Sequence, residues 1–327
     1  MTIPVLAQGE EHFTIPGPNE GLDLFLRYVP ARTATSDQRR RAVLYVHGAT
    51  FPSALSIAHR FDGQSWRDAL NDAGFDVWGL DFQGFGFSDR YPEMAAAAEA
   101  NAPLCPTGDA AAQLATAAEF ILEHQGLSAI SLLAHSWGCM AAARFAGEHP
   151  TLIDRLALFG PISRRDPPRY MPRPDGPAWR IVTVEAQWAR FIEDVPADEP
   201  PVLSRAHFDD WAKLYLDTDP ESRRHDPLGV KTPAGPLIDV LRAWHGELAF
   251  DPALVRAPVA ILRGAWDGLC TDADARWLFD AFTHAPLKRD VKIGRGTHLM
   301  HLETMRPALW AESIAFLLGN DAAPVPL

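Results

Sequence analysis

Short apolar segments separated by helical patterns constrain the fold of this chain more than any other feature of its sequence. The segments are continuously apolar, as expected for strands that are buried on both faces of a sheet. They lie at residues 22–29, 42–47, 75–81, 129–134, 155–160 and 258–264. Helical patterns lie at residues 64–73, 107–125, 137–148, 272–282 and 307–318. This alternation predicts an α/β fold, in which a mostly parallel sheet carries helices on both faces.

The alternation stops in the middle of the chain. Nearly half of the 28 prolines lie between Pro161 and Pro236. Amphipathic helical patterns in this region cover residues 181–193, 207–216 and 236–244. We therefore expect residues 1–160 and 250–327 to form a core domain, and residues 161–249 to form a helical cap inserted into it.

The composition argues against several classes of protein. A net charge of −12 with 47% hydrophobic residues is typical of a soluble globular protein, and it argues against binding of nucleic acid, which needs a basic surface. The three cysteines are too few for a disulfide scaffold. Residues 1–17 lack the basic start and the apolar run of a signal peptide, and no apolar stretch is long enough to span a membrane. We therefore expect a cytoplasmic protein with a small-molecule substrate and no stable membrane association; whether it forms a homodimer is left open.

The strongest motif is Ala134-His135-Ser136-Trp137-Gly138, which lies between a predicted buried strand and a predicted helix. A serine hydroxyl is a weak nucleophile and needs exposure, a base and an anion site nearby. A sharp strand-to-helix turn gives the exposure by holding the serine in a strained backbone conformation. The small residues two positions away on either side let the helix and the strand approach each other. Ser136 is therefore the predicted nucleophile.

Two backbone N–H groups are expected to bind the oxyanion. One is the amide of Trp137, in the first turn of the helix after the serine. The other lies in the loop His47-Gly48-Ala49-Thr50, where the glycine lets the backbone turn its next amide inward. Ala49 is the predicted donor and Thr50 the second choice, whereas His47 is expected to make structural hydrogen bonds.

A histidine from elsewhere in the fold must act as the base. One further strand is predicted at residues 287–293. The segment at residues 294–298, which ends in His298, directly follows it at the carboxyl edge of the sheet, where ligands gather in open α/β folds. His301 would point back over the following turn, and His135 would face away from the serine. His298 is therefore the predicted base.

The acid that orients this histidine should lie at the end of a neighbouring strand. Asp267 directly follows the predicted strand at residues 258–264. Its expected role is to hold the tautomer of His298 and to stabilise the imidazolium without taking the proton. Asp272 and Asp274 are expected to cap the next helix.

The chain order Ser136, Asp267, His298 resembles that of the α/β-hydrolase superfamily, and the likeness covers nearly all of the core. The loop HGAT, the segment GLDFQGFGFSDR and the turn GTHLMHLE stand in the expected order. The resemblance implies the α/β-hydrolase fold with an inserted helical cap, and a capped serine hydrolase that uses neither cofactor nor metal. It also implies a structural turn formed by four residues. These are Asp81, Gly84, Gly86 and Ser88.

The substrate pocket is expected between the sheet edge and the cap. Weak candidates for its lining are Thr50, His135, Glu185, Trp188 and Trp266. A medium-sized hydrophobic carboxylic ester or lactone is the expected substrate. The arginine-rich run at residues 164–180 is interpreted as a solvated loop, with the binding of an acidic substrate as the alternative.

Other activities stay open at this point. The elbow Ser136-Trp137-Gly138 is similar to that of proline iminopeptidases, whose cap carboxylates recognise a free amino group, and Glu185 is the candidate for that role. Hydrolysis of amides, hydrolysis of C–C bonds, acyl transfer and non-catalytic ligand binding are the further alternatives.

Overall fold

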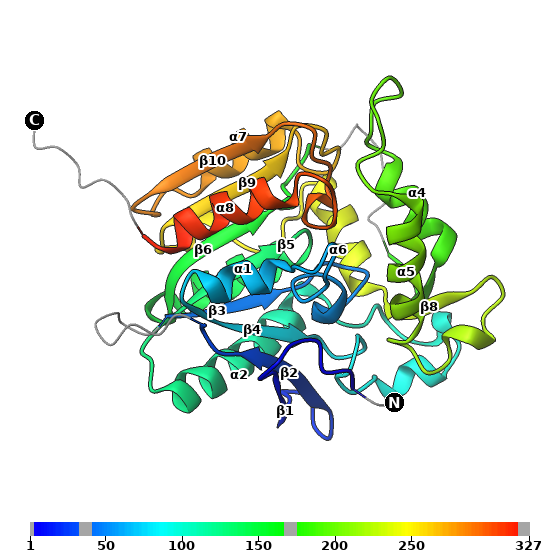
Figure 1. Ribbon diagram of the computed structural model, residues 1–327. Coiled ribbons are helices and arrows are strands. Elements are labelled where there is room, and N and C mark those ends of the chain that lie inside the picture. The colour runs from blue at the N-terminus through cyan, green and yellow to red at the C-terminus, as the bar shows by residue number, and fades with distance from the viewer. Residues whose placement is uncertain (1–2, 33–40, 167–174, 320–327) are drawn as a thin grey trace, which may run out of the picture.

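The computed structural model describes residues 3–32, 41–166 and 175–319. Its centre is an eight-stranded sheet with the strand order β1-β2-β4-β3-β5-β6-β9-β10 (Figure 1). These strands are β1 (Glu11–Pro16), β2 (Asp23–Val29), β3 (Arg41–Val46), β4 (Phe75–Asp81), β5 (Ile130–His135), β6 (Ile153–Phe159), β9 (Val259–Gly264) and β10 (Lys288–Ile293). The six strands from β4 to β10 pair in parallel, and β1 and β2 are antiparallel. The predicted mostly parallel sheet is confirmed.

Strand β1 is the one strand of this sheet that the sequence analysis missed. It lies at the sheet edge, pairs only with β2, and leaves most of its side chains exposed or half-buried. An edge strand of this kind carries no continuous apolar run, which is the signal that identified the buried strands.

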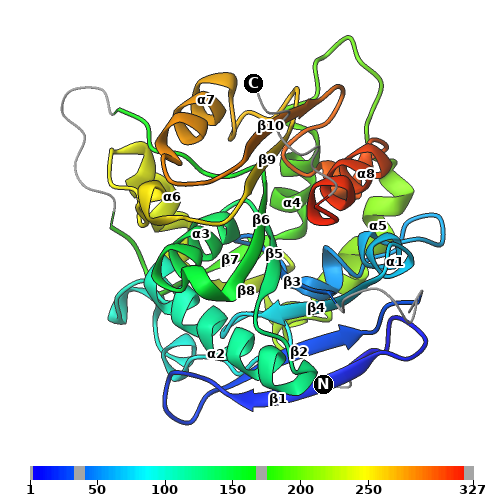
Figure 2. The ribbon, with the colours of Figure 1, turned by 90° about the vertical axis from the view of Figure 1, so that its left-hand side faces the viewer.

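Helices cover both faces of the sheet, as predicted. They are α1 (Trp66–Asp72), α2 (Thr107–Gln125), α3 (Gly138–Glu148), α7 (Asp272–Ala281) and α8 (Arg306–Leu317). Figure 2 shows α1 and α8 on one side of the sheet and α2, α3 and α7 on the other. Along β3, Val43 and Tyr45 pack in the core of the first side, whereas Leu44 and Val46 pack in the core of the second. Successive side chains of a strand point to opposite faces, so a strand covered on both faces is apolar throughout.

The sequence pattern predicts Thr107 as the residue that caps α2, and the structure differs from this prediction. Helix α2 begins at Thr107, and its N-cap residue is Pro106, which makes no side-chain capping bond. The carboxylate of Asp239 instead accepts hydrogen bonds from the backbone N–H and the hydroxyl of Thr107. A side chain distant in sequence satisfies this helix end, which no local pattern could show.

The turn after β4 anchors the loop that follows β3. The carboxylate of Asp81 accepts hydrogen bonds from the backbone N–H of Ser53 at 2.9 Å and from that of Phe87 at 3.1 Å. A Cβ on Gly86 would lie 2.2 Å from Asp81 Oδ2, so only glycine fits there. The hydroxyl of Ser88 donates to the backbone carbonyl of Asp81. These contacts agree with the structural role that the resemblance implied for this turn.

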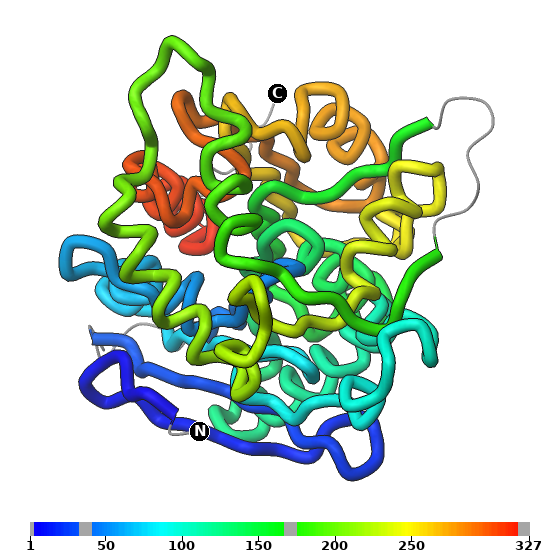
Figure 3. The backbone as a smooth tube through the Cα atoms, turned by 90° about the vertical axis from the view of Figure 1, so that its right-hand side faces the viewer, coloured from blue at the N-terminus to red at the C-terminus, as the bar shows by residue number. Residues whose placement is uncertain are grey.

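The middle segment lies against one end of the core (Figures 1 and 3). Its elements are β7 (Trp179–Thr183), α4 (Val184–Ile192), α5 (Arg205–Leu216), β8 (Gly229–Pro233) and α6 (Gly235–Trp244). The antiparallel pair of β7 and β8 was not predicted, because the residues of β7 were interpreted as the start of a helix. Part of the arginine-rich run, residues 167–174, lies outside the described residues. The division into a core and a cap at residues 161–249 stays a proposal.

The helices of the described ranges are modest in length. The longest, α2, has 19 residues and is amphipathic, with acidic side chains on its exposed face. None of them is both long and apolar enough to cross a membrane.

Candidate active site

Ser136 lies in the turn between β5 and α3. Its φ is 57°, in the left-handed region that residues other than glycine rarely adopt. Its backbone N–H donates to the carbonyl of Phe159 on the neighbouring strand β6 at 2.9 Å. The strained conformation that the sequence analysis expected for this serine is confirmed.

Gly138 opens helix α3 in close contact with the backbone after β3. A Cβ built on Gly138 would lie 2.3 Å from the carbonyl oxygen of His47. No side chain fits at that distance, and the atom it would meet belongs to the backbone. Glycine at this position therefore lets helix and strand approach, as expected from the motif.

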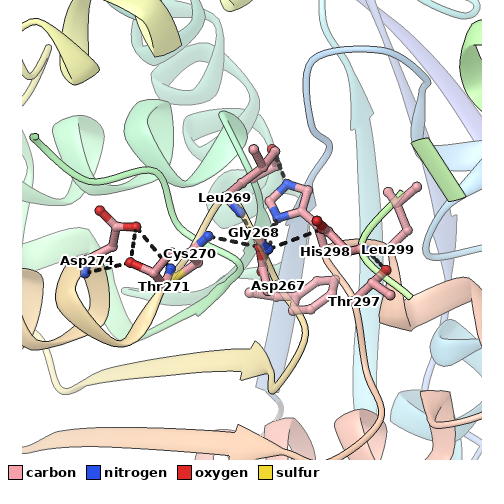
Figure 4. A network of polar contacts seen from close by, with 12 residues as sticks. Asp267, Gly268, Leu269, Cys270, Thr271, Asp274, Thr297, His298 and Leu299 are labelled. Carbon is pink, nitrogen blue, oxygen red and sulfur yellow. Dashed lines mark hydrogen bonds and ion pairs between the residues drawn. The ribbon is translucent and has the colours of Figure 1, made fainter. Parts of the chain in front are cut away.

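Three side chains from distant parts of the chain meet at the carboxyl edge of the sheet. His298 Nε2 lies 2.7 Å from Ser136 Oγ, and His298 Nδ1 lies 3.0 Å from Asp267 Oδ1 and 3.1 Å from Oδ2. Asp267 follows β9 and His298 follows β10, so the carboxyl ends of parallel strands bring them to the serine. All three side chains are buried. Figure 4 shows the carboxylate of Asp267 directed at the imidazole of His298.

The surroundings of Asp267 keep its carboxyl group ionised. Its Oδ1 also accepts hydrogen bonds from the backbone N–H groups of Leu269 at 2.9 Å and Cys270 at 2.8 Å. Burial acts to raise the pKa of Asp267, but the contacts with His298 and with these N–H groups outweigh it, so the pKa lies below its ordinary value. An ionised Asp267 accepts a hydrogen bond from His298 Nδ1–H. His298 Nε2 therefore faces Ser136 with its lone pair.

Two buried side chains fix the loop that carries His298. His135 Nε2–H donates to the backbone carbonyl of His298 at 2.9 Å. The carboxyl of Glu303 accepts from the backbone N–H of Thr297 at 3.1 Å and from the Thr297 hydroxyl. Burial raises the pKa of Glu303 to about 7. The sequence analysis did not single out Glu303, although an acidic residue within an otherwise apolar turn was a signal for it.

His301, the lesser candidate for the base, does not contact the serine. Its ring packs 4.5 Å from the ring of His135 and 5.4 Å from that of Phe159. Neither of its nitrogens has a hydrogen-bond partner within the part of the chain that the structure describes. Burial lowers the pKa of His301 to about 3, so the ring is neutral. The geometry favours His298 over His301 as the partner of Ser136.

Asp274 has the capping role expected of it. It forms a capping box with Thr271 at the start of α7, in which its carboxylate accepts the Thr271 N–H at 2.9 Å (Figure 4). Asp272 instead forms ion pairs with Arg263 and Lys292. Neither carboxylate reaches His298, which leaves Asp267 as its acidic partner within the described chain.

His47 fixes the peptide that carries the predicted oxyanion donor. The backbone N–H of Phe82 donates to His47 Nε2 at 3.1 Å, so Nδ1 carries the proton and donates to the carbonyl of Gly48 at 2.7 Å. In a trans peptide the C=O and the following N–H point in opposite directions. The N–H of Ala49 therefore points away from His47. His47 has the structural role that was expected of it.

The predicted oxyanion donors lie around the serine. Gly48 and Ala49 line the same small cavity as Ser136. Within the described ranges, the backbone N–H groups of Ala49 and Trp137 have no acceptor in the protein. Both groups are therefore available to an oxyanion, which is what the sequence analysis proposed for them.

The cavity in front of the serine has a volume of about 40 Å³. Its lining consists of Gly48, Ala49, Thr50, Phe51, His135, Ser136, Gln187, Arg190, His298 and Leu299. Of the predicted pocket residues, Thr50 and His135 therefore lie at the cavity. Gln187 and Arg190 of α4 were not predicted, because the helical pattern of the cap did not reveal which face meets the core.

Three other predicted pocket residues lie elsewhere. Glu185 is exposed at the start of α4. Trp188 packs against Phe208 of α5, and Trp266 lies under the guanidinium of Arg295. The structure does not bring these three side chains to the cavity beside Ser136.

A larger cavity of about 660 Å³ lies between the N-terminal segment, residues 54–60 and the end of α5. It contains none of the three residues Ser136, Asp267 and His298. Its wall residue Leu55 packs in one hydrophobic cluster with Phe51, which lines the small cavity. Size favours the larger cavity, but the reactive groups lie at the smaller one, and we place the candidate active site there.

Metal-binding groups are not gathered in this site. Within the described residues, no cluster of three or more His, Cys, Asp or Glu side chains has a geometry that could hold a metal ion. The three cysteines are buried and unpaired. Cys139 is the cysteine nearest to Ser136 in sequence, and burial raises the pKa of its thiol well above the ordinary value.

Comparison with known proteins agrees with this architecture. A sequence model of a family described as alpha/beta hydrolase fold matches residues 41–199. No curated protein matches the chain.

Solved structures are similar over almost the whole chain. An epoxide hydrolase from Vigna radiata superposes with a TM-score of 0.63 at 14% identity, covering 96% of this chain and 99% of that one. A serine hydrolase from the bacterium Cycloclasticus zankles gives 0.62 at 15% identity, covering 96% and 100%. A thermophilic esterase from Thermogutta terrifontis gives 0.55 at 18% identity, covering 94% and 98%. At such identities these similarities establish the fold and leave the reaction to be argued from the site.

Proposed function

The chain has the α/β-hydrolase fold, and we propose that it is a serine hydrolase that cleaves a carboxylic ester or lactone through an acyl-enzyme. One observation carries the proposal. Ser136 Oγ lies 2.7 Å from His298 Nε2, whose other nitrogen faces the buried carboxylate of Asp267. This arrangement gives a weak nucleophile a base and gives the base a fixed tautomer.

The first half of the reaction forms the acyl-enzyme. Ser136 Oγ attacks the carbonyl carbon while its proton passes to His298 Nε2. The negative charge on the former carbonyl oxygen is bound by the N–H groups of Ala49 and Trp137. The C–O bond to the leaving group then breaks, and His298 returns the proton to the departing alkoxide, which leaves as an alcohol.

The second half releases the acid. A water molecule gives a proton to His298 and attacks the acyl carbon, and the bond from that carbon to Ser136 Oγ breaks as the proton returns to the serine. Asp267 stays ionised throughout and stabilises the imidazolium. Overall, one ester and one water molecule are converted to a carboxylic acid and an alcohol.

The cavity in front of Ser136 is small for the proposed substrate. About 40 Å³ is close to the volume of a single water molecule, whereas sites for medium-sized ligands have about 300 Å³ or more. Helix α4 forms the wall opposite Ser136 through Gln187 and Arg190. We propose that α4 shifts away from the sheet edge to admit the substrate, and that its return excludes water from the acyl carbon.

The iminopeptidase alternative is less well supported by the site. Recognition of a free amino group needs a carboxylate at the cavity, and Glu185 is exposed outside it, whereas the cation of Arg190 lines it. We therefore place ester hydrolysis before iminopeptidase activity. We further propose a cytoplasmic location and a small-molecule substrate, without a nucleic-acid partner or stable membrane association.

Intact mass after exposure to an uncharged fluorophosphonate tests the proposal. Wild type should gain a single adduct, and Ser136→Ala should gain none. Ser131→Ala is the matched control, because Ser131 is a buried serine of the same strand β5. This control should react like wild type. A panel of 4-nitrophenyl esters should then be hydrolysed by wild type and the control alone.

Two results would overturn the proposal. Equal labelling of Ser136→Ala and wild type would place the reactive group elsewhere. Absence of an adduct and of ester turnover in wild type would point to a ligand-binding member of the fold.

A further inference from the structure

Two polar residues on one face of α4 line the cavity in front of Ser136. Gln187 and Arg190 are three residues apart, a spacing that puts them on the same side of a helix. Both line the small cavity together with Ser136 and His298. The remaining lining is apolar or backbone apart from Thr50 and His135. The face of α4 that meets the site therefore carries hydrogen-bond donors.

Gln187 holds a donor without a partner. Its side chain is only 1% exposed. Its amide lies near the Tyr215 hydroxyl, which donates to the carbonyl of Val182, and its Nε2 makes no hydrogen bond of good geometry within the described part of the chain. Buried polar groups are nearly always paired, so an unpaired amide at a reactive cavity needs an explanation. An acceptor atom on a bound ligand would provide that partner.

Arg190 brings a positive charge to the same place. Among the residues that line the cavity, it is the one with a permanent charge. Its Nη1 lies 3.2 Å from Glu193 Oε1, and the two side chains are 37% and 45% exposed. An exposed pair of this kind is weak and leaves other N–H groups of the guanidinium unused. A ligand can therefore compete for Arg190.

The other ionisable groups around the cavity do not oppose an anion. Among the described residues, no acidic side chain lines it, and the carboxylate of Asp267 is turned to His298 and to the backbone N–H groups of Leu269 and Cys270. Burial lowers the pKa of His135 far below its ordinary value, and the nearby cation of Arg190 acts in the same direction. His135 therefore stays neutral, and Arg190 is the cation that an anionic ligand meets.

We propose that Gln187 and Arg190 form a carboxylate-binding subsite, so that the preferred substrates are esters that carry a carboxylate besides the bond to be cleaved. The inference rests on the proposed function. A carboxylate accepts hydrogen bonds only, and its planar pair of oxygens fits the fork of a guanidinium. An amide N–H next to that fork adds a further donor. The subsite fixes the apolar body of such a substrate in one orientation over Ser136.

A matched pair of esters tests the subsite. 4-Nitrophenyl hexanoate and mono-4-nitrophenyl adipate share a six-carbon acyl chain, and only the second ends in a carboxylate. Wild type should show a kcat/KM for the adipate ester at least about tenfold higher, because charge-assisted hydrogen bonds are worth about that factor or more. The readout is the ratio of the two kcat/KM values, since a general loss of activity lowers both.

Variants of α4 locate the effect. Arg190→Gln should lower the ratio about tenfold or more, mainly through KM for the adipate ester. Arg190→Lys should keep part of it, because lysine supplies charge without the fork. Gln187→Glu should lower the ratio as well by repelling the carboxylate. Arg205→Gln is the control, since Arg205 is a cap arginine on α5 whose exposed side chain pairs with Asp209, and its ratio should equal that of wild type.

A binding measurement makes the test independent of turnover. Monomethyl adipate should slow the labelling of Ser136 by the uncharged fluorophosphonate at lower concentration than dimethyl adipate does. In Arg190→Gln the two compounds should protect equally. Labelling of each variant also reports that its fold and its nucleophile are intact.

The outcomes separate the two proposals. Equal kcat/KM values for the two esters, equal protection by the two adipates in wild type, or a ratio unchanged by Arg190→Gln would refute the carboxylate subsite while leaving the serine hydrolase standing. Failure of the fluorophosphonate to label wild type would instead refute the serine hydrolase.

Discussion

A side chain at Gly160, the residue after β6, would lie in close contact with His298 and Asp267. A Cβ built on it would lie 2.9 Å from His298 Nδ1 and 3.1 Å from Asp267 Oδ2. Its φ is 56°, so alanine is also strained there. Gly160→Ala therefore places one methyl group against the hydrogen bond between His298 and Asp267.

The displacement can be worked out from these distances. Ordinary contacts begin near 3.4 Å, so the imidazole or the carboxylate must move by about 0.5 Å. A misplacement of about 1 Å can lower a rate about 100-fold. Half of that displacement should lower turnover about tenfold, which corresponds to about 1.4 kcal/mol in the activation free energy. The left-handed backbone should also lower the free energy of unfolding by about 1–2 kcal/mol.

Gly126→Ala is the matched control. Gly126 follows α2 with a φ of 64°, and a Cβ there would have no neighbour within 4 Å. The control should lose similar stability in thermal unfolding, because the backbone strain is the same. It should keep the wild-type rate of Ser136 labelling and of ester hydrolysis. The difference between the two variants isolates the contact with His298 and Asp267.

Two results would refute this reasoning. A Gly160→Ala variant that folds and reacts within a factor of about two of wild type would show that the pair tolerates the displacement. Alternatively, Gly126→Ala could lose as much activity as Gly160→Ala. Backbone strain rather than the contact would then explain both losses.

The remaining predictions concern His298, His301 and Glu303. His298→Gln should lower turnover about 1,000-fold or more and His301→Gln less than tenfold, because only His298 contacts Ser136; steady-state kinetics showing the reverse order would make His301 the base. Burial raises the pKa of Glu303 to about 7 from 4.5, so the folded protein holds a proton that the unfolded chain has released between these values. The free energy of unfolding should therefore fall as pH rises from about 4.5 to about 7, and Glu303→Gln, which resembles the protonated acid, should remove this part of the fall. Tm should then drop more in wild type than in the variant between about pH 5 and pH 8, and parallel Tm curves would contradict the assignment.

Much of the sheet followed from local pattern. The segment at residues 75–81 was predicted as a strand and is β4. Buried parallel strands need apolar side chains on both faces, so their signal is contained in a few consecutive residues. The edge strand β1 and the strand β7 have no such requirement. Half-exposed residues can serve in a helix or in a strand, and pairing partners distant in sequence decide between them.

For the candidate site too, local pattern predicted some residues and missed others. Ser136, Asp267 and His298 each directly follow a predicted strand, and parallel strands carry their carboxyl ends to one edge. Gly160 and Glu303 were missed, because their importance lies in contacts with His298 and Thr297 that no spacing encodes. The cap residues that were predicted to line the pocket do not line the cavity beside Ser136. Trp188 and Gln187 are adjacent in sequence, but only Gln187 lines the cavity.

The sequence by itself determined the α/β architecture, the strained serine turn and the order of the three residues that meet there. Each of these depends on the periodicity of apolar residues or on residues within a few positions of one another. Only the tertiary structure decided that α4 presents Gln187 and Arg190 to Ser136, and that Asp239 satisfies the first turn of α2. A helix has the same local hydrogen bonds whichever face it turns to its neighbour. Its orientation is set by packing against residues far away in the chain, and a one-dimensional pattern does not contain that information.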